Sequence, residues 1–296
     1  MLSTHDTARR GLSTDELEEY RSIGLVVPSI RLPDDLLARL RRQLEEIQAS
    51  NLDVSSDVFR NVHLPFRGDI ATGIRGGGGA FLETATLPEI LDRVADCIGP
   101  DILLWGTQLF AKPAGTGKEV PWHQDGHFYC IDPLESCSVW IALDDVDTEN
   151  GCMRYIPGSH KLGLLEHMRE DRADVTASAS LASAAFDASQ ARDDVLGAGQ
   201  MSIHDVNLIH GSMPNRSDRR RVGFVIRYMP ATSHYDHHHV FPNQAKIDPG
   251  TLAMNQRPLW LVRGANRNAA NDLRVGHAGY DDIEQYVASR RGLASA

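Results

Sequence analysis

Apolar residues recur at helical spacing near the start of the chain. Ser13 followed by Glu16 forms a capping box, and an apolar stripe then runs to Gly24, which predicts a short helix. A short strand is predicted over residues 25–30, and a second helix begins at Pro33. The apolar face of that second helix consists of Leu36, Leu37, Leu40, Leu44 and Ile47. Because this face is continuous, we expect the helix to pack against a sheet.

Two further stretches before residue 100 carry weaker signals. A third helix is predicted over residues 86–98, with Thr86 and Glu89 as its capping box. The glycine run at 76–79 lacks the residue order of a phosphate-binding loop. We therefore interpret this run as a mobile loop that borders the functional site.

Strand-like stretches begin after residue 100. They cover residues 102–112, 139–143, 152–156, 199–203 and 221–229. Turn residues at 149–151 predict that the third of these strands returns as the neighbour of the second. Antiparallel pairs in this order predict a mainly β fold with flanking helices, whose core is a double-stranded β-helix, a jelly roll like that of the cupins.

The pattern predicts one domain over residues 1–296, with a helical N-terminal support over 1–100 and the jelly-roll core over 101–230. Within the core, residues 163–198 are rich in Ala, Ser, Asp and Arg, too polar for an interior, and are interpreted as a partly helical lid. The C-terminal segment, 231–296, is expected to pack back on the core.

Composition restricts the class of protein. The formal net charge of −10 argues against a nucleic-acid partner, which would favour a basic surface. No stretch approaches the roughly 18 consecutive apolar residues of a membrane helix, and the polar first ten residues lack the apolar centre of a signal peptide. We therefore expect a cytoplasmic protein, and its four cysteines are expected to be reduced.

The most informative chemistry is in the sequence His123-Gln124-Asp125. Residues two apart in an extended segment share a face, so His123 and Asp125 can present a nitrogen and an oxygen to one metal ion. His210 is the candidate third ligand, and two histidines with one carboxylate form the facial site of non-heme Fe(II) oxygenases. Arg221, eleven residues later, could hold a carboxylate of a keto-acid cosubstrate with two parallel hydrogen bonds.

Two alternatives compete with this assignment. His204 lies six residues before His210 and could itself be the third ligand. The sequence His234-Tyr235-Asp236 repeats the spacing of the first two ligands, but the residues after it have helical rather than strand spacing. We therefore interpret His234 and Asp236 as a loop pair.

Several motifs occur together and in order over roughly residues 100 to 230. They are Lys112-Pro113, Trp122-His123-Gln124-Asp125-Gly126, Val139 to Asp145, Glu149 to Cys152, Ile156 to His160, and Leu208 to Ser212 with Arg221. In this combination the chain resembles the phytanoyl-CoA dioxygenase family of Fe(II)- and 2-oxoglutarate-dependent oxygenases. The resemblance also favours His210 over His204, because in the family the later histidine, followed by Gly-Ser, binds the metal.

The resemblance implies an oxidoreductase that binds Fe(II) through His123, Asp125 and His210 and uses 2-oxoglutarate and O2. It implies that Arg221 pairs with the distal carboxylate of 2-oxoglutarate. Gln108, Lys112 and Ser212 are further candidates for contact with the cosubstrate. In halogenating relatives a small residue replaces the carboxylate ligand, so Asp125 favours hydroxylation, whereas desaturation, epimerisation or cyclisation would use the same ligands.

The expected substrate is a small polar metabolite, such as a natural-product intermediate, an amino acid or an organophosphonate. Its candidate contacts are Arg60, His127, Arg263 and Arg267, and together with Lys112 these arginines would suit an anionic head group. The expected products include succinate and CO2, and the expected assembly is a monomer or a homodimer. A cupin-like protein that binds a metal or a small ligand without turnover is the alternative of another class.

Overall fold

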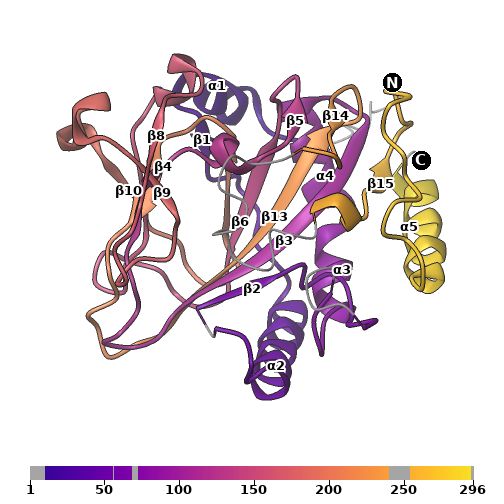
Figure 1. Cartoon of the computed structure of the whole chain (residues 1–296), viewed down its shortest axis with the longest axis horizontal. Helices are drawn as coiled ribbons and strands as arrows, with labels where there is room; N and C mark the ends of the chain where they lie inside the picture. Colours follow the sequence, from indigo (N-terminus) through magenta and orange to yellow (C-terminus); the bar gives the residue numbers. More distant parts are fainter. Residues whose placement is uncertain (1–10, 56, 69–72, 240–253, 295–296) are drawn as a thin grey trace, which may run out of the picture.

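The structure is a computed structural model, and it describes residues 11–55, 57–68, 73–239 and 254–294. The first ten residues, which the predicted N-terminal support includes, lie outside this range. No helix in the described ranges is long and apolar enough to cross a bilayer. Most of the strands belong to two sheets, and helices cover one of them (Figure 1).

The larger sheet has the strand order β1-β11-β6-β13-β3-β15, and β2 also pairs with β3. Its members are β1 (Leu25–Val26), β2 (Val58–Arg60), β3 (Ile102–Lys112), β6 (Cys137–Ala142), β11 (Met201–Asp205), β13 (Arg221–Pro230) and β15 (Trp260–Arg263). The long strands β3 and β13 form its centre, with Arg221 opposite Lys112 and Val225 opposite Gln108. Their apolar character makes them the best predicted strands of the chain.

The smaller sheet has the order β10-β7-β12-β4. Its members are β4 (Val120–His123), β7 (Met153–Tyr155), β10 (Arg192–Asp194) and β12 (His210–Ser212). The chain alternates between the two sheets, as in a double-stranded β-helix, and the predicted fold class is therefore confirmed.

The predicted pairing of the strand at 152–156 with the strand at 139–143 is wrong. The strand β7 lies in the smaller sheet, between β10 and β12, whereas β6 lies in the larger sheet. Both edges of β6 are already occupied by β11 and β13. The turn residue Asn150 bonds to the backbone of Asp145 and Asp147, and so stabilises a loop that crosses between the sheets.

The alternation of side chains along β13 separates the core from the site. Its even-numbered apolar residues pack with the helices in the main core, which includes Val222, Phe224, Ile226 and Tyr228. The odd-numbered residues Arg221, Val225 and Arg227 instead line cavities on the opposite face of the sheet. The chemistry therefore lies on the side of the smaller sheet, and the helices lie on the other side.

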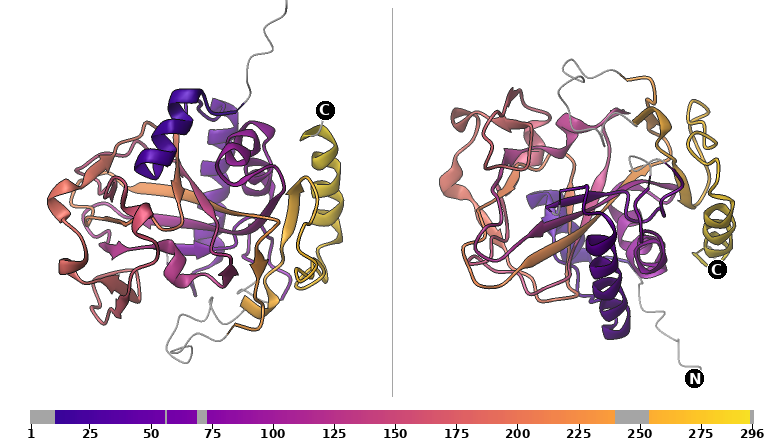
Figure 2. Two further views of the ribbon diagram at one scale, coloured as in Figure 1. Left: turned by 90° about the horizontal axis from the view of Figure 1, so that it is seen from above. Right: turned by 60° about the horizontal axis from the view of Figure 1, so that its bottom comes forward.

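Helices cover the larger sheet and its edge. They are α1 (Thr14–Ile23), α2 (Asp34–Ser50), α3 (Gly79–Ala85), α4 (Pro88–Ile98) and α5 (Asp281–Ala294). Phe81 of α3 packs edge-on against Phe224 of β13, with ring centroids 4.9 Å apart. In the left view of Figure 2 the C-terminal helix, in yellow, lies at the opposite end of the molecule from the pink segment around residue 180.

The first predicted capping box is confirmed, and the second is wrong. Ser13 accepts from the backbone N–H of Glu16, and the Glu16 carboxylate accepts from the backbone N–H of Ser13. The hydroxyl of Thr86 instead donates to Leu82 in the last turn of α3. The following helix α4 begins at Pro88, a residue whose fixed φ suits a first helical position.

The glycine run at 76–79 leads into α3 and lies against α2. The side-chain amide of Gln43 on α2 donates to the carbonyls of Gly76 and Gly78, at 2.7 and 2.9 Å. None of these glycines lines the two cavities described below. The expectation that this loop borders the functional site is therefore wrong.

Residues 163–198 contain less helix than expected. They form the strand pair β8 (His167–Arg169) and β9 (Ala179–Leu181), two 3-10 turns, and β10. The first 3-10 turn covers Ser183–Ala185, and the second covers Ala188–Gln190. The side chain of Asp187 caps the second turn. The remaining short elements are the 3-10 turns Asp125–Phe128 and Ser159–Leu162 and the paired strands β5 (Ile131–Asp132) and β14 (His234–Tyr235).

Gly223 on β13 provides a test of the packing beside Arg221. A Cβ atom at this position would lie 2.1 Å from Cζ2 of Trp140, the ring over which the Arg221 guanidinium lies. We expect Gly223→Ala to lower the free energy of unfolding by about 1–3 kcal/mol, because the indole must move. Chemical denaturation would measure this loss.

The control is Gly197→Ala, whose added Cβ meets chiefly the end of the flexible Gln200 side chain, at 3.1 Å. Equal stability of the Gly223 and Gly197 variants would contradict a rigid contact between Trp140 and the backbone of β13.

Candidate functional site

Three metal-binding side chains converge between the two sheets. His123 ends β4, Asp125 begins the 3-10 turn after it, and His210 begins β12. Because β4 and β12 are antiparallel neighbours, His210 lies directly opposite His123. The three ligand atoms lie within 4.8 Å of one another, and all three residues are buried. The structure thus brings His210 to the neighbouring pair His123 and Asp125, although it lies far from them in the sequence.

Backbone carbonyls fix the orientation of both imidazoles. Nδ1 of His123 lies 2.8 Å from the carbonyl of Pro121, and Nδ1 of His210 lies 3.0 Å from the carbonyl of Leu208. A carbonyl can only accept, so Nδ1 carries the proton and Nε2 keeps its lone pair for a metal. Two imidazole nitrogens and one carboxylate are a suitable donor set for Fe(II) with open positions.

The protonation states of Asp125 and His210 also suit a metal. Burial alone would raise the pKa of Asp125, but Arg227 and the neighbouring imidazoles hold it well below its usual value. Ser138 also donates a hydrogen bond of 3.0 Å to Oδ2 of this carboxylate. Burial and the nearby His123 lower the pKa of His210 well below its usual value, so it is neutral. A cation can therefore bind without first displacing a proton.

His204 lies beside this site but is not a member of the three-residue group. Its Nε2 atom is 3.7 Å from Oδ2 of Asp125, and its ring centroid is 4.9 Å from that of His210. Neither ring nitrogen has a hydrogen-bond partner among the described residues. The position of His204 is that of a neighbour of Asp125, which favours His210 as the third ligand.

A narrow cavity extends from the three-residue site to Arg221. Its wall includes Trp140, Met153, Ser212, Arg221 and Val225. Nε of the Arg221 guanidinium donates to the carbonyl of Gly151 at 3.1 Å, and its carbon lies 5.2 Å from the centroid of the Trp140 ring. Burial lowers the pKa of Arg221 to about 10, so the residue remains a cation at neutral pH. The cavity thus has a metal-binding end and a cationic end.

Of the three other residues predicted to contact a cosubstrate, only Ser212 lines this cavity. The amine of Lys112 lies behind the wall and donates to the backbone carbonyls of Ser212 and Met213. Burial and the nearby Arg221 lower the pKa of Lys112 to about 6. Gln108 lies in a different cavity, where it accepts a hydrogen bond of 2.9 Å from Arg227. The structure thus places Lys112 and Gln108 outside the wall of the narrow cavity, and contact of either residue with 2-oxoglutarate or substrate stays a prediction.

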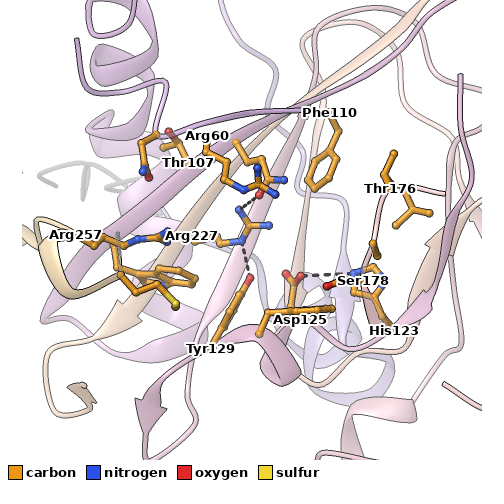
Figure 3. Close-up of a pocket in the computed structure, with 17 residues that line it drawn as sticks. Arg60, Thr107, Phe110, His123, Asp125, Tyr129, Thr176, Ser178, Arg227 and Arg257 are labelled. Atoms are coloured by element: carbon orange, nitrogen blue, oxygen red, sulfur yellow. Dashed lines mark hydrogen bonds and ion pairs between the residues drawn. The ribbon is translucent and has the colours of Figure 1, made fainter. Parts of the chain in front are cut away.

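A second and larger cavity, of about 150 Å³, opens on the other side of His123 and Asp125 (Figure 3). Apolar and aromatic residues form much of its wall, including Trp105, Phe110, Phe128, Tyr129 and Met254. Its basic residues are Arg60, Arg227 and Arg257. Thr176, Ala177 and Ser178 from the 163–198 segment complete the wall, which is consistent with the predicted lid.

Only one of the four residues predicted to contact a substrate, Arg60, lines this cavity. His127 faces elsewhere and stacks on His167, with ring centroids 4.2 Å apart. Arg263 forms an ion pair of 2.6 Å with Asp92, and Arg267 one of 2.7 Å with Asp101. None of these three residues lines either cavity, so the structure does not bring them to the site and their substrate contacts stay predictions.

Two arginines of the larger cavity were not predicted from the sequence. Arg227 lies six residues after Arg221 on the same strand, so the two share a face, and this spacing could have identified it. Arg257 precedes β15 in a stretch without regular spacing, and it has no comparable signal. The second His-X-Asp sequence contributes no ligand, since His234 and Asp236 do not belong to the three-residue group.

Comparison with known proteins identifies similar chains and folds. The sequence profile of the phytanoyl-CoA dioxygenase (PhyH) family matches residues 20–223. The peroxisomal phytanoyl-CoA dioxygenase of Bos taurus is 28% identical over 238 residues, which cover 76% of this chain and 70% of that protein. The apo structure of the non-heme monooxygenase ThoJ matches with a TM-score of 0.63 and 26% identity, over 95% of this chain and 99% of that one.

A structure of CytC3 with Fe(II) and alpha-ketoglutarate has a similar fold. It matches with a TM-score of 0.61 and 22% identity, over 92% of this chain and 97% of that one.

Asp194, the last residue of β10 in the smaller sheet, provides a test of the electrostatics near Arg221. Its side chain is buried and accepts a hydrogen bond of 2.7 Å from Ser202, and burial raises its pKa from 3.8 to about 6. The folded protein therefore binds a proton here that the unfolded chain has already released, and stability falls as the pH rises through this window. We expect the stability of Asp194→Asn relative to wild type to improve by about 2 kcal/mol between pH 4.5 and 7.5.

Denaturation curves at the two pH values would measure this change. The matched control is Asp193→Asn, because Asp193 is partly exposed and paired with Arg154 at 2.9 Å. The buried charge would be excluded as the cause if both variants showed the same pH dependence relative to wild type.

Proposed function

Because the chain belongs to the phytanoyl-CoA dioxygenase family of Fe(II)- and 2-oxoglutarate-dependent oxygenases, we propose that it hydroxylates an unactivated carbon of a small polar metabolite. The cofactor is Fe(II), 2-oxoglutarate is the cosubstrate, and the reaction releases succinate and CO2. The observation that carries the proposal is one cavity with His123, Asp125 and His210 at one end and Arg221 at the other.

The roles of the three ligands follow from their positions. His123 and His210 would bind the iron through Nε2, because their Nδ1 atoms are held by backbone carbonyls. Asp125 would supply the anionic ligand, kept ionised by Arg227. Bound Fe(II) supplies the activation of O2 that hydroxylation of an unactivated carbon requires. The protein contributes a rigid donor set with room for other ligands.

Arg221 and the cavity around it would orient the cosubstrate. The guanidinium can donate to the distal carboxylate of 2-oxoglutarate, and Ser212 at the same wall offers a hydroxyl. Trp140, Met153 and Val225 surround the path between the two ends with apolar surface, which excludes water. The contact between Arg221 and the carbonyl of Gly151 fixes the position of the charge.

The larger cavity is the proposed substrate site because His123 and Asp125 belong to its wall. Its volume of about 150 Å³ favours a small metabolite over a long acyl-CoA. The presence of the Asp125 carboxylate favours hydroxylation over halogenation. Desaturation, epimerisation and cyclisation use the same ligands. Analysis of the product would therefore distinguish them from hydroxylation. The cytoplasmic location, the absence of a nucleic-acid partner and the monomeric or homodimeric state remain predictions from sequence.

The alternative of a binding protein without turnover is disfavoured by Arg221. A protein that only bound metal would not need a buried guanidinium at the far end of the same cavity. Burial of such a charge is costly, and an anionic ligand offsets the cost.

Anaerobic reconstitution with Fe(II) and 2-oxoglutarate tests the proposal. We expect wild type to show the weak visible charge-transfer band of an iron-chelated keto acid. His210→Ala should lose the band because it loses a metal ligand. Arg221→Ala should need at least about tenfold more 2-oxoglutarate, because an ion-paired hydrogen bond is lost.

The matched control is Arg220→Ala, which removes the neighbouring guanidinium that pairs with Asp144 at the surface, 3.3 Å away. This variant should retain the band at the wild-type concentration of 2-oxoglutarate. Wild-type protein that binds iron without forming the band would overturn the dioxygenase assignment and favour the binding protein. If wild type does form the band, succinate release with a panel of metabolites would identify the substrate.

A further inference from the structure

Arginines are prominent among the described residues that line the larger cavity. Three of the residues that line it are arginines: Arg60, Arg227 and Arg257. Among its described lining residues, Asp125 is the single carboxylate. A bound divalent metal would add further positive charge to the same wall. The cavity therefore favours an anion over a neutral or cationic molecule.

The charge of Arg227 is already balanced within the protein. Its Nε donates to the hydroxyl of Tyr129 at 2.6 Å, and its Nη1 donates to Gln108 at 2.9 Å. Its charge also lowers the pKa of Asp125, so the two buried side chains interact electrostatically. In Figure 3 it lies in the middle of the cavity, between Arg257 and Asp125. Arg227 therefore separates the metal-binding side from the Arg257 side.

Among the described residues, the charge of Arg257 has no such partner. Its Nε atom is buried and lacks a hydrogen-bond partner in the described part of the chain. Of the carboxylates that the structure describes, none forms an ion pair with it. Arg257 as a whole is half-buried, but its Nε is a buried donor without an acceptor, which is uncommon in native proteins. The geometry around Arg257 is that of a site for an external anion.

The surroundings of Arg257 hold its guanidinium in place. Its central carbon lies 5.4 Å from the centroid of the Trp105 ring, a cation–π contact. The strand β3 makes room for it at Gly106, where a Cβ atom would lie 3.2 Å from Nη1. His63 nearby is buried, and burial together with Arg257 lowers its pKa to about 3, so it contributes no charge at neutral pH.

Arg60 adds a second cation to the same cavity. It ends β2, where it pairs in register with Gln108 of β3. Figure 3 shows its side chain beside that of Arg227 and on the same side of the cavity as Thr107. Arg60 and Arg257 thus line the same cavity, and guanidiniums are suited to bind the oxygens of a carboxylate, a phosphonate or a sulfate.

We propose that Arg257, assisted by Arg60, binds an oxyanion group of the substrate, and that Trp105 and Met254 contact the carbon skeleton next to that group. The inference rests on the proposed function, because it places the reacting carbon of the same molecule near His123 and Asp125. The substrate class is thus a small metabolite with one terminal oxyanion and an apolar portion. The oxyanion subsite is separate from the Arg221 end of the narrow cavity, which receives the cosubstrate.

Binding of three probes of similar shape tests the proposal: phenylacetate, phenylphosphonate and neutral phenylacetamide. Titration calorimetry would use the anaerobic Fe(II) protein with saturating 2-oxoglutarate, so that the Arg221 site is filled and no turnover occurs. We expect at least one anion to bind at least about tenfold more tightly than the amide. The comparison of the two anions shows whether the subsite prefers a carboxylate or a phosphonate.

Variants identify the residue responsible. Arg257→Gln should abolish the preference for the anion, and Arg257→Lys should restore part of it. Arg267→Gln is the matched control, because it removes a surface guanidinium paired with Asp101 and should leave the preference unchanged.

Equal affinities for the anions and the amide, a preference that persists in Arg257→Gln, or no binding of either anion would each overturn the anion subsite. The charge-transfer band separates this failure from that of the proposed function. A normal band without anion preference removes the subsite alone, whereas absence of the band in wild type removes the dioxygenase assignment. In that second case, calorimetry with the Zn(II) protein would still decide whether Arg257 selects anions.

Discussion

The antiparallel pairing of β4 with β12 is the constraint on which the site depends. It places His210 opposite His123, although 86 other residues separate them in the chain. The pairing sets the positions of the ligands, whereas their tautomers are set locally, because the carbonyl two residues before each histidine, of Pro121 or Leu208, accepts from its Nδ1. A shift by one residue would turn either imidazole to the other face of the sheet. The larger sheet then supplies the opposite wall of the cavity, including the charged side chains of Arg221 and Arg227.

The fold could be predicted from the sequence wherever a pattern was local. The strand Ile102–Lys112 agrees at both ends, because a long apolar run between turn signals leaves little choice. The strand pairing of β7 was wrong for the opposite reason. The turn residues at Asn150 are typical of a hairpin. Whether β6 has a free edge for β7 depends on β11 and β13, which pair with β6 and come later in the chain. The same limit applies to Thr86, whose hydroxyl bonds to the preceding helix.

The site shows a similar division. The spacing of His123 and Asp125 and the sequence around His210 are local signals, and the structure brings these residues together. The substrate contacts were harder to predict, because a surface arginine generally pairs with whichever carboxylate the fold brings near it. Arg263 pairs with Asp92 and Arg267 pairs with Asp101 in this way, and the sequence predicts neither ion pair. Period-two spacing from Arg221 would have identified Arg227.

Charge distinguishes the two cavities that meet at the ligands. Behind the wall of the narrow cavity, Lys112 lies near Arg221, but burial lowers the pKa of Lys112 to about 6, so Arg221 is the cation at that end at neutral pH. One guanidinium is sufficient for the one distal carboxylate of 2-oxoglutarate. In the larger cavity, Arg227 is balanced by Asp125, so its charge is used to keep a ligand ionised rather than to attract a molecule. The charge of Arg257 remains, and since Arg227 lies between it and the ligands, an anion there would leave the metal-facing side to a neutral part of the substrate.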